Sequence, residues 1–462
     1  MMRTLVLRRT AAVAILLVGF SSLAQGDEPT RENSGEVIDT FLESLNADKD
    51  SDDSDRCPGE TEADRIDAEP APVTAADDMD QEPSSDAATA ELTDEPQTLP
   101  DGIDAAPIPG KPGTKREKKA AMPAVDLQLS SEMLEFKEEL RDTLAWYYDR
   151  PQKVNDRSPW GIMHWLIPYG VDSYLLDTSG KRQNTIGYLC YNYPCKGQRL
   201  FHLDSKGQMA AHIGPGLQGH RGQFLAMLAQ SKVDPAYPMR IEGRDFTVAD
   251  LIEYEKRTCE AGTELTFKLI ALAHYSKHDD KWKNTRGEEW DIPRLIREEL
   301  KQPVVGAACG GTHRMTGFSF AVRKHEARNL LMDGQWNRAS KFIDAYHDYT
   351  FSLQNRDGSF STNWFASKGD LPDPQRRLQT SGHIAEWLVY SVSPEKLQDK
   401  EVVDSVKYVT RLLAEGKQTR WEIGPLGHAL HALALYDERV FGGKSGQRGE
   451  QLAGRGKATK QR

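Results

Sequence analysis

The chain has 462 residues and a formal net charge of -11. Much of the negative charge lies near the N-terminus, where five aspartates fall between Asp48 and Asp55. An acidic chain of this kind argues against a nucleic-acid partner. All 12 histidines, all 9 tryptophans and four of the five cysteines follow Ala124. We therefore expect one large folded domain after this residue.

The N-terminus has the layout of a cleaved secretory signal. Arg3, Arg8 and Arg9 precede an apolar run at residues 11–20, which is followed by Ser22-Leu23-Ala24. We expect cleavage after Ala24, so residues 1–24 are a signal peptide and the protein is exported, either periplasmic or secreted. No later stretch is apolar enough to span a membrane. Residues 25–123 are acidic and rich in Pro and Ala, which predicts a disordered linker with one candidate short helix at 35–45.

The folded domain is expected at residues 124–441. Ser130 can cap a first helix that ends near Trp146. Residues 160–169 are aromatic and form either a short buried helix or a cavity wall. Residues 186–213 are the one convincing β region, with strands at 200–204 and 208–212 around the turn Ser205-Lys206-Gly207.

From Gly214 onward the pattern is helical. The spacing of apolar residues predicts helices at 218–230, 248–257, 264–277, 292–300, 313–329, 336–354, 377–391, 401–415 and 425–440. Some of these are apolar on most faces, whereas 292–300 and 401–415 are two-faced. Such alternation predicts a mainly α fold, an α/α toroid built as a ring of helical hairpins, with one small β-hairpin insertion. The glycine-rich, basic residues 442–462 predict a disordered tail.

A short sequence pattern recurs along the chain, in which a glycine and a histidine lie just before an apolar helix. In one copy Glu264 takes the place of the histidine. We expect turns that deliver these side chains to the first turns of helices that run in the same direction, so that they meet at one end. The catalytic candidates are His220, Glu264, His313, His383 and His428. A histidine at a helix N-terminus is held toward its neutral form, which suits proton transfer or metal binding. A glutamate can serve as acid, base or ligand.

Other side chains are candidates for holding a substrate. Arg221 and Arg314 follow two of the histidines and suit an anionic group such as a uronate carboxylate. Trp160, His164 and Trp364 suit an apolar or sugar-stacking wall, and Glu386 lies one turn from His383. The alternative is that all these residues cap or brace helix ends, with glycines needed only for close packing. The sequence leaves the metal and any cofactor undecided.

Export permits disulfides, and four cysteines in the folded domain are candidates. Cys190 and Cys195 bracket a tight turn, while Cys259 and Cys309 lie just upstream of two helices at nearly equivalent places. A four-cysteine zinc site is the alternative, although no Cys-x-x-Cys spacing supports it.

Two stretches carry a resemblance to known families. Residues 354–360, Gln-Asn-Arg-Asp-Gly-Ser-Phe, resemble the turn motif of α/α-toroid proteins, the superfamily of terpene cyclases and protein prenyltransferases. Residues 160–441 resemble an uncharacterised family of exported bacterial proteins, through phrases such as 214–220, 264–274 and 424–430. The resemblance implies the toroid fold. Members are often labelled "ADP-ribosylation factor-directed GTPase-activating protein", but this chain lacks the cysteine spacing of the zinc finger that such an activity requires.

Three functions remain open on this basis. The first is a carbohydrate-active lyase or hydrolase that acts on an acidic glycan. The second is a non-catalytic protein that binds or organises a cell-envelope component. The third is a terpene-type cyclase, which is disfavoured because the folded region has no Asp-x-Asp-Asp or Asp-Asp-x-x-Asp sequence.

Overall fold

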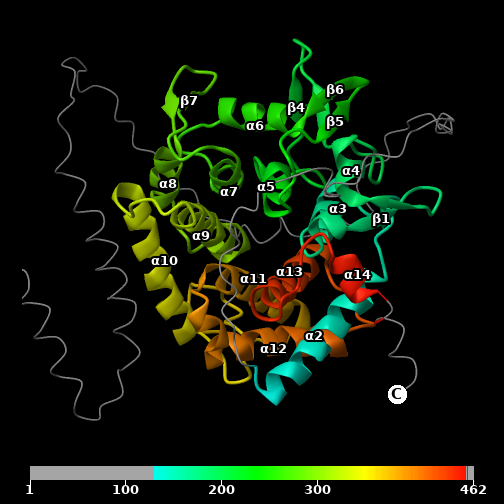
Figure 1. Ribbon diagram of the computed structural model, residues 1–462, viewed down its shortest axis with the longest axis vertical. Helices are drawn as coiled ribbons and strands as arrows, with labels where there is room; N and C mark the ends of the chain where they lie inside the picture. Colours follow the sequence, from blue (N-terminus) through cyan, green and yellow to red (C-terminus); the bar gives the residue numbers. More distant parts are fainter. Residues whose placement is uncertain (1–128, 454, 456–462) are drawn as a thin grey trace, which may run out of the picture. The chain divides into compact units, whose positions relative to one another are not determined.

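The computed structural model describes residues 129–453 and 455 (Figure 1). The expected signal peptide and linker lie outside these residues. The described part is mainly helical, as predicted. No helix in it is both long and apolar enough to cross a membrane.

The helices at the start of the described part begin where capping residues predict. In α2 (Ser131–Tyr148) the Ser130 hydroxyl accepts a hydrogen bond from the Met133 amide at 3.2 Å. In α3 (Pro159–Leu166) Ser158 is the cap, proline occupies the first position, and all eight residues are buried. Residues 160–166 therefore form a buried helix, one of the two alternatives that the sequence left open.

The later helices follow the predicted order. Five are buried along most of their length: α5 (Gln223–Gln230), α7 (Thr266–Tyr275), α9 (Thr312–Glu326), α11 (Pro374–Ser391) and α13 (Ile423–Val440). The short helix α4 (Thr185–Cys190) is also buried throughout. The others are α6 (Val248–Arg257), α8 (Ile292–Leu300), α10 (Gly334–Ser352), α12 (Lys400–Glu415) and α14 (Arg448–Leu452). Short 3-10 helices lie at Gly170–Asp172, Ala308–Gly311 and Glu395–Gln398. Helices α6 and α8 begin and end at the predicted residues.

The buried helices form a continuous series of contacts. Helix α5 packs on α7, α7 on α9, α9 on α11, α11 on α13, α13 on α3, and α3 returns to α5. The two-faced helices cover this series: α6 and α8 pack on α7, α10 on α9, and α12 on both α11 and α13. In Figure 1 the buried helices lie next to one another, with α6, α8, α10, α12 and α2 around them. The predicted division into buried and two-faced helices is therefore confirmed.

The strands in the described residues form four separate antiparallel pairs. These are β1 (Tyr174–Leu176) with β2 (Arg182–Asn184), β3 (Phe201–Leu203) with β4 (Met209–Ala211), β5 (Pro238–Ile241) with β6 (Arg244–Thr247), and β7 (Trp282–Lys283) with β8 (Glu289–Trp290). The predicted hairpin is β3–β4, in which Leu203 pairs with Met209. The sequence analysis did not predict the other three pairs, whose strands are two to four residues long.

Two regions differ from those expected in the kind of structure that they form. Residues 185–190 form helix α4 rather than a strand, because the Asn184 side chain caps it by accepting from the Gly187 amide at 3.0 Å. At the other end, order extends beyond Phe441. The Arg448 guanidinium is buried and donates to the Ala434 carbonyl at 3.2 and 3.3 Å, and Leu452 is also buried. The expected disordered tail therefore includes a packed helix.

None of the four cysteines in the described residues forms a disulfide, contrary to the prediction. Cys190 is buried in α4, and the backbone of Cys195 instead pairs with Gln198. Burial raises the pKa of Cys195 to about 12 and that of Cys259 to about 11. These thiols therefore pack as small apolar groups. Cys309 differs from these thiols because it is only partly buried.

Candidate functional site

Five histidines meet in the interior: four lie in different helices, and His220 lies in the turn before α5. His313 lies among them, with ring centroids 5.3 Å from His220, 5.6 Å from His383 and 5.2 Å from His428. The centroids of His383 and His428 are 3.9 Å apart, and His164 lies 5.3 Å from His428. All five side chains are buried. We call His164, His220, His313, His383 and His428 the histidine cluster.

Left-handed glycine turns deliver two of these histidines. Gly222, with φ of 81°, caps α5 just after His220, and Gly311, with φ of 86°, caps α9 just before His313. A Cβ at Gly311 would lie 2.4 Å from the Val304 carbonyl oxygen, so glycine is required there for space as well as for conformation. The predicted turn with a histidine on the first turn of the helix is confirmed for His313.

His383 and His428 reach the cluster differently, and their expected place on a first turn is wrong. Helix α11 begins at Pro374, because Asp373 caps it and proline occupies its first position; Gly382 therefore lies inside the helix. A Cβ at Gly382 would lie 2.8 Å from that of Ala429, and one at Gly427 would lie 2.3 Å from the His164 carbonyl oxygen. These glycines allow α11, α13 and α3 to approach closely, which brings their histidines together.

Four of the cluster histidines have an acceptor at Nδ1. His220 contacts Glu264 Oε2 at 2.6 Å and His428 contacts Glu386 Oε2 at 2.7 Å. His383 contacts the Gln379 carbonyl at 2.7 Å, and His164 the Trp160 carbonyl at 2.8 Å. An oxygen acceptor holds the proton on Nδ1 and leaves the lone pair of the neutral ring on Nε2. All four rings therefore favour the same tautomer.

His313 is the exception. Both of its ring nitrogens are buried and neither has a hydrogen-bond partner, while only 6% of the residue is exposed. Burial, and after it the neighbouring His428, His220 and His383, hold the pKa of His313 well below its ordinary value. The ring is therefore neutral. A buried polar group without a partner costs about 1–3 kcal/mol, so its presence calls for an explanation.

Glu386 joins the cluster to a sixth histidine. It accepts from His428 through Oε2 and from His431 Nδ1 through Oε1, at 2.5 Å. Burial raises the pKa of Glu386, but the electrostatic attraction and hydrogen bonds of the neighbouring His428 and His431 outweigh it and hold the pKa well below its ordinary value. His431 was not among the candidate residues that the sequence analysis named. Its position one turn after His428 was the signal that could have placed it here.

Glu264 and three aromatic rings border the cluster. The Glu264 side chain is 34% exposed, so the His220–Glu264 pair is where the cluster approaches solvent. The Trp160 ring centroid lies 4.0 Å from that of His164, and the Trp364 ring centroid lies 5.5 Å from that of His383. Phe267, which sequence reasoning missed, lies 4.7 Å from His220 and 5.1 Å from His313.

The two candidate arginines have other surroundings. The Arg314 guanidinium is buried, donates to Glu299 Oε2 at 3.0 Å and also contacts the Pro303 carbonyl. Because these groups occupy it, the structure gives Arg314 a bracing role instead of the predicted role in binding a substrate. Arg221 follows His220 and is exposed.

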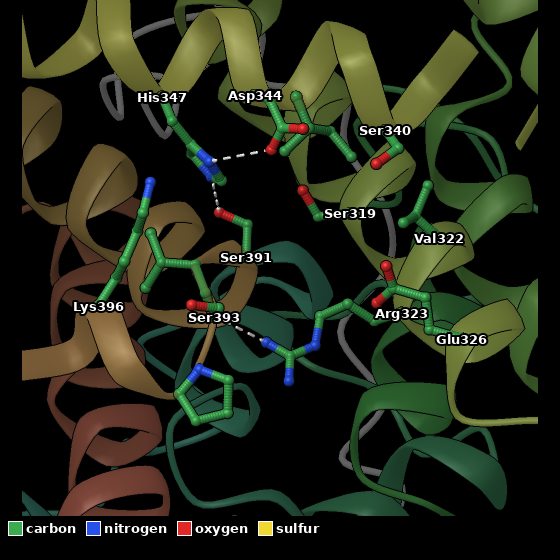
Figure 2. A pocket seen from close by; sticks show the side chains of 13 residues that line it. Ser319, Val322, Arg323, Glu326, Ser340, Asp344, His347, Ser391, Ser393 and Lys396 are labelled. Carbon is green, nitrogen blue, oxygen red and sulfur yellow. Dashed lines mark hydrogen bonds and ion pairs between the residues drawn. The ribbon is translucent and has the colours of Figure 1, made fainter. Parts of the chain in front are cut away.

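Two cavities lie away from the histidine cluster. The larger, about 550 Å³, is lined by residues such as Gln230, Lys324, Tyr390 and Arg439, at the C-terminal ends of α5, α9, α11 and α13. The histidines come together near the N-terminal or middle parts of these helices, and the C-terminal ends of the same helices meet at this cavity. The helices therefore run in the same direction, as expected. The smaller cavity, about 250 Å³, is lined by His347 and Ser391 among others (Figure 2).

The function must be argued from this geometry alone. Comparison of the chain with models of protein families, with curated proteins and with solved structures finds no match.

Proposed function

We propose that this protein is an exported carbohydrate-active lyase or hydrolase, built as an α/α toroid, in which His220 and Glu264 form the acid–base pair. The observation that carries the proposal is the 2.6 Å contact between His220 Nδ1 and Glu264 Oε2 at the partly exposed edge of the histidine cluster. The continuous series of contacts from α3 through α13 supports the toroid.

The pair has the chemistry that acid–base catalysis requires. With its Nδ1 proton held by Glu264, the neutral His220 ring takes up a proton at Nε2, and the carboxylate stabilises the imidazolium that results. In a lyase this proton comes from the carbon next to a uronate carboxylate; as the carbon–carbon double bond forms, the bond to the departing glycosidic oxygen breaks and the imidazolium returns the proton to that oxygen. In a hydrolase the proton comes from the water that attacks the anomeric carbon, and the imidazolium gives a proton to the departing oxygen as the glycosidic bond breaks. Glu264 therefore acts by orienting His220 and stabilising its charge.

The substrate class follows from the groups beside the pair. Arg221 is exposed and adjacent to His220 in the chain, so it supplies positive charge for a substrate carboxylate. Trp160 and Trp364 flank the cluster and provide rings on which sugars stack. An acidic glycan carries both the carboxylate and the apolar sugar face that these groups suit.

The test is an activity assay on uronate-containing and neutral polysaccharides. Unsaturated products identify a lyase, whereas new reducing ends without unsaturation identify a hydrolase. We expect His220→Gln and Glu264→Gln each to lower kcat by about 10²–10⁴-fold. His278→Gln, which changes an exposed histidine elsewhere, should retain full activity. Absence of turnover on every acidic glycan, or wild-type activity in Glu264→Gln, would reject the proposal.

A second candidate is a non-catalytic protein that binds a cell-envelope component. The observation favouring it is that the apolar ring of Phe267 packs against both His220 and His313, beside the proposed acid–base pair. Binding of the purified protein to isolated cell-wall polysaccharide separates the two candidates. If binding persists in Glu264→Gln and no polysaccharide is cleaved, the non-catalytic function is favoured.

A further inference from the structure

The histidine cluster contains a set of donors for which the acid–base pair gives no role. Cys309 Sγ, a ring nitrogen of His313 and a ring nitrogen of His383 all lie within 4.8 Å of one another. They come from two segments of the chain, the turn before α9 with its first helical turn, and the middle of α11. We propose that Cys309, His313 and His383 bind a divalent transition-metal ion, with Zn²⁺ the expected occupant.

His313 is the residue that most requires such a ligand. Both of its ring nitrogens are buried without a hydrogen-bond partner, and the side chain lies among the other cluster rings. Coordination to a metal satisfies one of these nitrogens without breaking any existing hydrogen bond. The same side chain, if it were only a packing residue, would leave both nitrogens unsatisfied.

His383 already has the outer contact that is typical of a metal-bound histidine. Its Nδ1 lies 2.7 Å from the Gln379 carbonyl, one turn earlier in α11. The proton is therefore on Nδ1, and Nε2 carries the lone pair for the metal. Histidine ligands almost always donate their second ring N–H to a carbonyl or carboxylate in this way.

Cys309 supplies the sulfur ligand. Its backbone is left-handed, with φ of 49° and ψ of 41°, and its carbonyl accepts a hydrogen bond from the Thr312 hydroxyl at 2.8 Å. These constraints hold the residue beside the start of α9. On binding, the thiol loses its proton to solvent and the thiolate forms the bond to the metal, so metal uptake releases one proton.

The distances between the three donor atoms require only a small movement of side chains when the ion binds. Tetrahedral zinc has Zn–N distances of about 2.0–2.1 Å and a Zn–S distance of about 2.3 Å, which place the donors about 3.3–3.6 Å apart. The set, with a maximum of 4.8 Å, therefore has to contract by little more than one ångström. A thiolate with two imidazoles favours zinc over calcium or magnesium, which prefer oxygen.

A fourth donor is adjacent. The His428 ring centroid lies 3.9 Å from that of His383, and the Nδ1 of His428 is held by Glu386. Its Nε2 lone pair therefore has the same character as that of His383. His428 thus completes the site through a water molecule that binds the ion. The inference is independent of the proposed acid–base pair, because metal binding is measured without turnover.

The experiment uses the full-length protein, reduced, stripped with a chelator and titrated with Zn²⁺ and separately with Co²⁺. We expect one ion per chain and a rise in Tm on zinc addition. With Co²⁺ we expect a sulfur-to-cobalt charge-transfer band. If wild-type protein binds neither ion at micromolar concentrations, or the band is absent, the proposal is overturned.

Variants assign the ligands. Cys309→Ser should abolish the charge-transfer band, and His313→Ala and His383→Ala should each weaken binding by more than about 100-fold, since even outer contacts are worth 10–100-fold. His278→Ala, an exposed histidine, should bind as wild type does. Metal binding that survives Cys309→Ser and His313→Ala unchanged would place the ion elsewhere and reject the assignment. Glu264→Gln should keep the metal even if it abolishes activity, which separates this inference from the proposed function.

Discussion

At the scale of single residues, the clearest consequence of burial is at His347, which lines the smaller cavity (Figure 2). Its Nε2 contacts the Ser391 hydroxyl at 2.6 Å, and its ring stacks on Trp387. Burial, with a smaller contribution from the charge of Lys396, lowers the pKa of His347 to about 4. Asp344 Oδ1 lies 4.0 Å from His347 Nδ1, but this carboxylate does not offset the cost of burying the charged ring.

This shift predicts how stability depends on pH. The unfolded chain, in which the histidine pKa is about 6.5, takes up the proton first, so the stability due to neutral His347 is present above about pH 6.5 and is lost as the pH falls to about 4. When the pH falls from 7 to 4, wild type should therefore lose about 3 kcal/mol more unfolding free energy than His347→Gln loses. Urea unfolding at both pH values measures this. Parallel pH profiles for the two proteins would contradict it, and His278→Gln is the control for an exposed histidine.

At the scale of elements, Glu299 joins three helices. From the last turn of α8 it accepts from the Leu265 amide and the Thr266 hydroxyl, both at 2.6 Å, at the start of α7. It also accepts from Arg314 in the first turn of α9 at 3.0 Å. This buried network explains why Arg314 points to α8 and not to a ligand.

Removal of the Glu299 charge should be costly. Glu299→Gln leaves the buried Arg314 guanidinium without its counter-charge, for which we expect a loss of about 3–5 kcal/mol in unfolding free energy. Glu260 pairs with Arg286 at 3.1 Å and both side chains are about half exposed, so Glu260→Gln should cost no more than about 1 kcal/mol. Denaturant unfolding of both variants makes the comparison. Equal losses would show that the Glu299 network has no special role.

At the scale of the whole described part, α14 packs against the rest of the fold through contacts with α13 and with Asp172. Arg448 donates to the Ala434 carbonyl of α13, and the Asp172 carboxylate accepts from the Gly446 amide at 2.8 Å and the Arg448 amide at 3.0 Å. Leu452 is buried as well. Residues after Phe441 therefore contribute to the fold.

Truncation after Phe441 should lower stability. Loss of the buried Leu452 side chain alone removes about 1.5–3 kcal/mol, and loss of the hydrogen bonds of Arg448 adds to it. We expect a lower Tm for the truncated chain in thermal unfolding, with Arg448→Met showing part of the decrease. An unchanged Tm would mean that α14 adds nothing to stability.

The sequence by itself determined the features that depend on local interactions. Apolar spacing and caps act within a few residues, so the helices, the β3–β4 hairpin and the histidines that converge were predicted. Whether a capped helix continues through a glycine is also partly local, and the Asp373-Pro374 start of α11 was an available signal.

Only the tertiary structure decided what these elements do to one another. Gly382 and Gly427 serve close packing rather than turns, and Arg314 braces α8. His431 joins Glu386, which lies 45 positions away in the chain, and Cys309 lies beside His313 and His383 instead of forming a disulfide. These outcomes depend on which side chains meet when α3, α8, α9, α11 and α13 pack together. Such contacts join residues far apart in the chain, and local sequence patterns do not predict them.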